Sequence, residues 1–129
     1  MSGVEWLRDD EWRTEDRPRV EYDQIALIGI PWREFETRFA MKFAENDGRY
    51  EAPGPHAYAA MRTASGALFL LDHYFDYPEP GVYLAGRVDE DFDAQRREFA
   101  RALELPADAF RQVRRGDEWF DGASGRRLS

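Results

Sequence analysis

The two histidines are the side chains of this chain best suited to acid–base or metal chemistry. His73 follows Asp72 in an apolar run, and His56 lies in a stretch rich in proline and glycine that predicts a loop. If the apolar run is a strand, Asp72 and His73 point to opposite faces and do not form a dyad. Catalysis also needs several groups that converge. We therefore interpret His73 as a core or edge histidine with a backbone partner, neither catalytic nor metal-binding.

The carboxylates do not have the spacing of a metal site. Asp72 and Asp76 share a strand face but lie about 13 Å apart along it, too far to chelate one ion. The acidic run 89–93 resembles the start of an EF-hand loop, but Ala94 and Ala100 stand where that loop needs glycine and glutamate. The chain has no cysteine and no common phosphate-binding, nucleophile or zinc-protease motif. We predict no catalytic residue, metal or cofactor, which favours a binding protein over an enzyme.

Three apolar, aromatic-rich runs between Ala57 and Val88 are separated by turn residues. This pattern predicts an antiparallel meander with a short hairpin loop at 64–66 and a second turn at 77–81. The middle run is apolar on both faces until Asp72, which indicates a central strand that is covered on both sides near its start.

Helical periodicity flanks the meander. Pro31 suits the first position of a helix whose apolar stripe runs to Phe43, and residues 46–48 form its expected end. A second helix is predicted to begin at 89–91, and a third, short one to lie within 106–116. The sequence thus predicts an α+β fold, an antiparallel β-meander sheet with two to four helices packed on it. Its predicted core is Trp32, Phe35, Phe39, Phe69, Leu71, Phe75, Phe99 and Leu103.

A length of 129 residues fits a single α+β domain over 1–129. Residues 1–20 form a densely charged N-terminal segment, in which we expect at least one of Trp6 and Trp12 to dock on the domain. Residues 122–129 are expected to form a flexible tail. No run approaches the roughly 18 apolar residues of a membrane span, and the N-terminus does not resemble a signal peptide. We therefore expect a cytoplasmic protein with no membrane partner.

The net charge is −8 and is unevenly distributed. Residues 1–93 carry 20 acidic and 10 basic side chains, whereas residues 94–129 carry 6 and 8. An acidic body repels phosphates, so nucleic acid is not the expected partner. It is compatible with a basic protein partner, and plain solubility is the alternative explanation.

Residues 96–116 resemble part of a phage-repressor-type helix-turn-helix. The Phe99-Ala100 pair, Leu103 and the closing Arg-Arg-Gly carry this resemblance, while Glu104 stands at the turn in place of the usual glycine. Two amphipathic helices that cover the sheet would explain the same residues, and the acidic body opposes DNA binding.

The chain is small, acidic, rich in aromatic residues and without cysteine or a catalytic motif. In these general characters, although not in any shared motif, it resembles the immunity proteins of bacterial polymorphic-toxin systems. The resemblance implies tight neutralisation of a cognate, often basic toxin by occlusion of its active site.

We therefore interpret the chain as a protein-binding or inhibitory protein. One alternative is a small enzyme or ligand-binding domain with a site in the sheet, and another is an accessory or helix-turn-helix-like regulatory protein. In the first interpretation tyrosines anchor the partner and carboxylates steer its association. We expect two turns and a helix start to bring these residues to related parts of the surface. The predicted partner-binding residues are Asp72, Asp76, Glu79, Tyr74, Tyr77, Tyr83, Asp89, Glu90 and Asp91.

Overall fold

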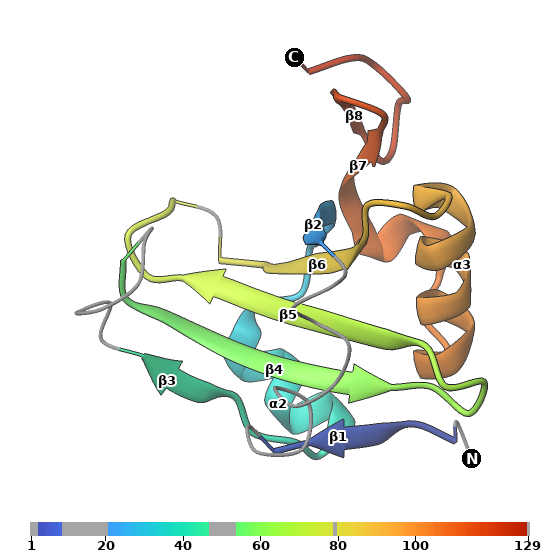
Figure 1. Ribbon diagram of the computed structural model, residues 1–129. Helices are drawn as coiled ribbons and strands as arrows, with labels where there is room; N and C mark the ends of the chain where they lie inside the picture. Colours follow the sequence, from blue (N-terminus) through green and yellow to red (C-terminus); the bar gives the residue numbers. More distant parts are fainter. Residues whose placement is uncertain (1–2, 9–20, 47–53, 79, 129) are drawn as a thin grey trace.

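The computed structural model describes residues 3–8, 21–46, 54–78 and 80–128. Over these residues the chain forms one antiparallel sheet of eight strands with two α-helices, which confirms the predicted α+β class (Figure 1). No helix among the described residues is long and apolar enough to cross a membrane.

The sheet has the strand order β1-β4-β5-β6-β2-β7-β8, and β3 also pairs with β4. β1 and β3 pair with successive stretches of β4, at residues 60–62 and 56–58. The strands are β1 (Glu5–Leu7), β2 (Tyr22–Ile28), β3 (Ala44–Asn46), β4 (His56–Arg62), β5 (Leu68–Tyr74), β6 (Val82–Arg87), β7 (Phe110–Arg115) and β8 (Glu118–Asp121).

The predicted meander is β4, β5 and β6. The first hairpin closes at residues 63–67, where the Thr63 carbonyl accepts from Gly66 N and the Thr63 N–H donates to the Ala67 carbonyl. β5 lies between β4 and β6, as expected of a central strand. Both of its faces are covered near its start: Phe69 belongs to the main core, and Leu70 to a smaller apolar cluster.

The first helix, α2 (Trp32–Phe39), ends well before the predicted stop at 46–48, so that prediction was wrong. Ala40 adopts a left-handed conformation (φ 51°) and ends the helix. The buried Glu36 carboxylate then accepts the backbone N–H of Phe43 at 2.9 Å, which holds the chain in a turn instead of a further helical turn. Phe43 is buried although it lies outside the helix, and the chain continues into β3. The last two residues of the predicted stop lie outside the described part.

The second helix, α3 (Phe92–Leu103), begins as predicted. The Asp91 side chain accepts the N–H of Asp93 and forms its N-cap. Glu104, which stands at the turn of the helix-turn-helix that the sequence resembles, adopts a left-handed conformation (φ 56°) and ends the helix.

The buried Gln95 side chain attaches α3 to the sheet, because its amide group bonds both the backbone N–H and the backbone carbonyl of one β6 residue. Its amide accepts from Arg87 N at 2.9 Å and donates to Arg87 O at 2.8 Å. Gly86 leaves the room for this contact, because a Cβ there would lie 2.5 Å from Gln95 Oε1. These bonds fix α3 to the end of β6.

The predicted third helix was wrong. Only a 3₁₀ turn, η2 (Ala107–Ala109), follows Pro106, and residues 110–115 form β7. β7 pairs with the edge of β2 that β6 leaves open, so the backbone hydrogen bonds of β2 override the local helical pattern. Gly116, with φ 62°, forms the turn into β8 instead of a helix stop. The strand replaces the second helix of the helix-turn-helix that the sequence resembles.

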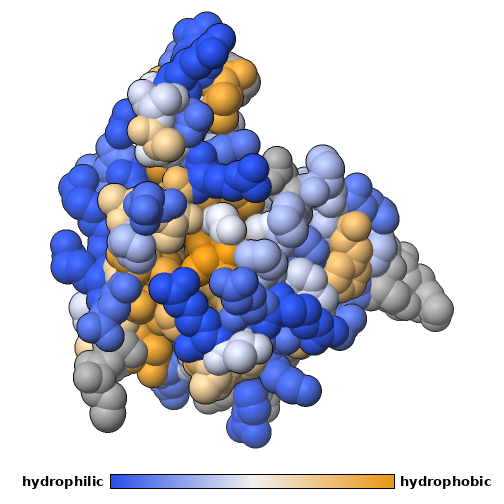
Figure 2. Space-filling view, turned by 180° about the vertical axis from the view of Figure 1, so that it is seen from behind, coloured by the Kyte–Doolittle hydropathy of each residue, from blue (hydrophilic) through white to orange (hydrophobic). Residues whose placement is uncertain are grey.

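Both helices contribute to one core. The buried Phe35 of α2, and Phe99 and Leu103 of α3, pack with residues of β2, β4, β5 and β6. Seen from behind, apolar surface remains visible between hydrophilic side chains (Figure 2). The two short helices therefore do not cover the apolar residues completely.

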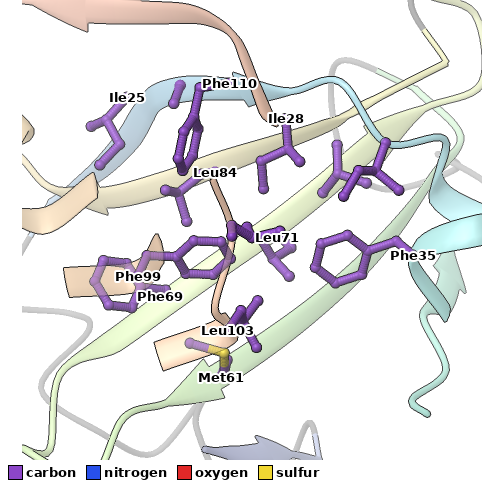
Figure 3. Packing of buried hydrophobic residues seen from close by; sticks show 14 of the residues in the cluster. Ile25, Ile28, Phe35, Met61, Phe69, Leu71, Leu84, Phe99, Leu103 and Phe110 are labelled. Carbon is purple, nitrogen blue, oxygen red and sulfur yellow. The ribbon is translucent and has the colours of Figure 1, made fainter. Parts of the chain in front are cut away.

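The predicted core is confirmed at five positions, and Figure 3 shows these side chains converging in one cluster. The prediction was wrong for Phe75, which is 38% exposed because β5 ends at Tyr74 and Phe75 begins the next turn. Trp32 and Phe39 are only partly buried, at the edge of the core. The confirmed positions are Phe35, Phe69, Leu71, Phe99 and Leu103.

The ends of the described chain follow the sheet. Trp6 docks edge-on to Phe35 at 6.1 Å, as we expected of at least one N-terminal tryptophan, while Trp12 lies outside the described residues. After β8 the chain turns back along it, and Leu128 N donates to Trp119 O at 2.7 Å. The flexibility that we expect of residues 122–129 remains a prediction.

Candidate functional site

Three of the predicted partner-binding residues meet at one end of the sheet. The rings of Tyr74, Tyr77 and Tyr83, which we call the tyrosine cluster, lie 4.8, 6.1 and 6.3 Å apart. They come from the end of β5, the β5–β6 turn and the start of β6. Tyr77 is 40% exposed, and the other two residues are partly buried. The cluster is therefore a supported aromatic surface and not a closed core.

Strand alternation explains why these rings share a face. Phe69 points into the core, so the even-numbered side chains of β5, including Asp72 and Tyr74, point outward. Asp72 is the register partner of Tyr83 on β6, so Asp72 lies beside the cluster. Tyr77 is drawn back toward the strand because its N–H donates to Tyr74 O at 3.1 Å.

β4 extends the aromatic face with two residues that the sequence analysis did not select as partner-binding. His56 is the register partner of Tyr74, and their rings are 5.6 Å apart. Tyr58 is the register partner of Asp72. A signal for both was present in the sequence: a hairpin centred on residue 65 pairs positions that are equally far from it, such as 56 and 74.

Burial and neighbouring charge suppress ionisation of the cluster. The pKa of Tyr74 is raised to about 12, first by burial and then by the nearby Asp72 carboxylate and the other two tyrosines. Gln24 Nε2, which lies 3.4 Å from the Tyr74 hydroxyl, acts in the opposite direction and lowers the pKa, but it does not outweigh the other causes. Tyr74 is therefore a neutral phenol at physiological pH, suited to hydrogen bonding and apolar contact and not to nucleophilic attack.

Both histidines have backbone partners. His73 is buried and stacks on Trp32, with the ring centroids 5.6 Å apart. Its Nδ1 atom lies 2.9 Å from Gly81 O. His56 begins β4 instead of lying in the predicted loop, and its Nδ1 lies 2.8 Å from Gly54 O. Because a carbonyl only accepts, each Nδ1 carries the proton and donates. The predicted backbone partner of His73 is thus confirmed.

The part of the chain that the structure describes contains no group of three or more His, Asp or Glu side chains that could hold a metal ion.

On the other side of the same turn, Phe75 presents a second exposed ring. It contacts Trp32 and His73, each with ring centroids at 5.6 Å. The Arg33 guanidinium lies 3.9 Å over the Trp32 ring. The β5–β6 turn therefore displays two exposed aromatic side chains, Phe75 and Tyr77, and each is supported by neighbouring rings.

The predicted acidic residues divide between two places. Asp72 lies beside the tyrosine cluster, and the exposed Asp76 lies in the β5–β6 turn. Glu79 lies outside the described residues. The run 89–91 lies beyond the opposite end of β6. Our expectation that all these residues share one part of the surface was therefore wrong for 89–91.

This second acidic group is engaged by local partners. Arg87 forms two hydrogen bonds with Asp89, at 2.8 and 2.9 Å, and a longer ion pair with Glu90. Asp91 caps α3. These contacts hold the connection between β6 and α3 in place.

A comparison of the chain with models of protein families, with curated proteins and with solved structures found no match.

Proposed function

We propose that this chain is a protein-binding domain whose interaction surface is centred on the β5–β6 turn. The observation that carries the proposal is the pair of exposed rings, Phe75 and Tyr77, which lie against other aromatic side chains. Tyrosine and tryptophan are among the residues most enriched at the energetic centres of protein interfaces. Because each of these two rings already lies against neighbouring aromatic side chains, little conformational freedom is lost on binding.

The charge around the turn favours a basic partner. Asp72 and Asp76 lie at this end of the sheet, and the protein as a whole carries −8. Opposite charges on a partner would accelerate association and fix its orientation, while the aromatic contacts would determine how long the complex lasts. The competing explanation, that these acids only maintain solubility, predicts no such dependence.

An inhibitory role is the specific form that we propose for this binding. A small domain with a preorganised aromatic and acidic face is suited to cover the active site of a basic toxin, as the general resemblance to immunity proteins implies. Inhibition is separable from binding and has its own test.

Site-specific photo-crosslinking in the native host identifies the partner. A benzophenone side chain at position 77 should give a discrete crosslinked protein, whereas the same group at position 88 should not. Val88 is the matched control because it is 38% exposed but lies at the opposite end of β6. The same crosslinking pattern at both positions would count against a surface at the turn.

Binding kinetics with the purified partner then test the surface. We expect Tyr77→Ala to weaken affinity at least about tenfold, mainly through faster dissociation. Asp76→Lys should slow association at low salt, whereas Asp108→Lys, the same charge change on the exposed η2 turn, should have little effect. Wild-type kinetics in both Tyr77→Ala and Asp76→Lys would refute this surface. A partner that is bound but keeps its full activity would refute the inhibitory role alone.

A further inference from the structure

A concave site separate from the tyrosine cluster lies between α3 and the β7–β8 hairpin. It is an open cleft of about 740 Å³ that shares no residue with the tyrosine cluster. In Figure 1 the hairpin extends beyond the rest of the sheet, above the start of α3. The volume falls in the range of typical small-molecule sites, roughly 300–1,000 Å³.

The cleft has an apolar floor. Leu105, Phe110 and Val113 line it and are buried in the main core, and the partly buried Phe120 packs against the same core. A ligand seated here would remove apolar side chains from water, which favours a bound molecule with an apolar part.

Two arginines of the cleft are held next to its aromatic residues. Arg96 and Arg115 both contact the Asp93 carboxylate, through its two different oxygens. The guanidinium of Arg96 lies 6.0 Å from the Phe110 ring centre, and that of Arg115 lies 5.5 Å from the Phe120 ring centre. Asp93 thus holds the guanidinium groups of Arg96 and Arg115 beside the apolar floor of the cleft.

Arg97 and Arg101 complete the rim. They are one helical turn apart on α3, both are exposed, and both line the cleft. No carboxylate among the described residues lies within ion-pair distance of either one. These two guanidinium groups are therefore available to an anion.

The acids at the cleft only partly offset this charge. Four arginines line the cleft, against two lining acids, Glu104 and Asp121, and the Asp93 carboxylate that pairs with Arg96 and Arg115. The cleft is thus locally basic in a protein of net charge −8. A surface selected for solubility alone does not account for a basic hollow with an apolar floor in an acidic chain.

We propose that this cleft binds a small organic carboxylate with an apolar body. The carboxylate would lie between Arg97 and Arg101, and the apolar body on Phe110, Val113 and Phe120. Arginine suits this role because its planar guanidinium can pair with a carboxylate through two parallel hydrogen bonds. A polyanion such as nucleic acid is disfavoured, because its further phosphates would meet the acidic body.

Decanoate is the probe, titrated into the full chain by calorimetry with amide chemical shifts recorded in parallel. We expect saturable one-to-one binding that shifts the resonances of Ala100, Val113 and Phe120. Decanol, which lacks the charge, and inorganic phosphate, which lacks the apolar body, should each bind at least about tenfold more weakly. If decanoate does not saturate, or if decanol or phosphate binds as tightly, the proposal is wrong.

Variants connect the binding to the cleft. Arg97→Gln with Arg101→Gln should weaken decanoate binding at least about tenfold, while the charge-conserving Arg97→Lys with Arg101→Lys should retain more of the affinity. Arg38→Gln, which removes an exposed arginine on α2, is the control and should bind as the wild type does. Ala107→Trp, which fills the cleft from the exposed η2 turn, should abolish binding. Wild-type affinity in either the double glutamine variant or Ala107→Trp would overturn the site.

Discussion

Gly81→Ala tests the close backbone approach that positions the β5–β6 turn. A Cβ at position 81 would lie 2.2 Å from Ile28 O and 3.3 Å from Leu27 Cδ1. The two backbones would have to separate by about 0.8 Å to bring the first contact to 3.0 Å. Ile28 and Leu27 are both fully buried, and the closest atom is backbone, so no side-chain rotation relieves the overlap.

The expected cost follows from this geometry. Overpacking of a well-packed site costs about 1–3 kcal/mol, and the smaller conformational entropy of the unfolded alanine variant offsets about 0.4–1 kcal/mol of it. We expect Gly81→Ala to lower the free energy of unfolding by about 1–2 kcal/mol, measured by urea denaturation. The tyrosine cluster should be disturbed as well, because Gly81 lies between Tyr77 and Tyr83 in the chain, and near-ultraviolet circular dichroism would report the change.

Gly29→Ala is the matched control, since Gly29 directly follows Ile28. A Cβ there would meet its nearest atom, Arg111 Cγ, at 3.4 Å, which is an ordinary contact. We expect this variant to be as stable as the wild type or slightly more stable. If Gly81→Ala unfolds at the same urea concentration as Gly29→Ala, the close approach of the two backbones does not constrain the turn.

Three further predictions concern the core and two titrating groups. Phe69→Ala should lower the free energy of unfolding by about 3–5 kcal/mol, and Phe39→Ala by less because Phe39 is only partly buried; equal urea midpoints for the two variants would contradict the packing of α2 on the sheet. Because the pKa of Tyr74 is raised, the native state holds the phenolic proton more tightly than the unfolded chain does. The free energy of unfolding should therefore fall as the pH rises from about 10 toward 12. Tyr74→Phe should remove that loss, together with the latest-titrating phenolate absorbance. Burial raises the pKa of Asp93, but its two arginine partners outweigh this and lower the pKa overall, so the carboxylate contributes stability at neutral pH that is lost as the solution is acidified below about pH 4. Asp93→Asn should therefore be less stable at pH 7 and lose less stability on acidification, and an unchanged acid profile would contradict the arginine contacts.

The sequence alone determined the elements whose signals are local. The meander could be predicted because its strands are neighbours along the chain and its loops are short. The centre of the first loop even implies which residues of β4 and β5 are opposite, and so implies the contact of His56 with Tyr74. The start of α3 was equally local, since the acidic cap and the apolar stripe belong to the helix itself. The proposed interaction surface rests on this predictable part of the chain.

Tertiary structure decided the elements that depend on distant partners. β7 forms because β2, from the first part of the chain, offers an open edge where Ala26 pairs with Val113, and no local pattern reveals that edge. α2 ends early because the Glu36 carboxylate binds Phe43 N, a contact that helical periodicity does not include. Residues 89–91 are separated from the tyrosines because the two groups lie at opposite ends of β6. The arginine-lined cleft exists only because the β7–β8 hairpin lies against α3, since the pairing of distant strands places basic and apolar side chains around one hollow.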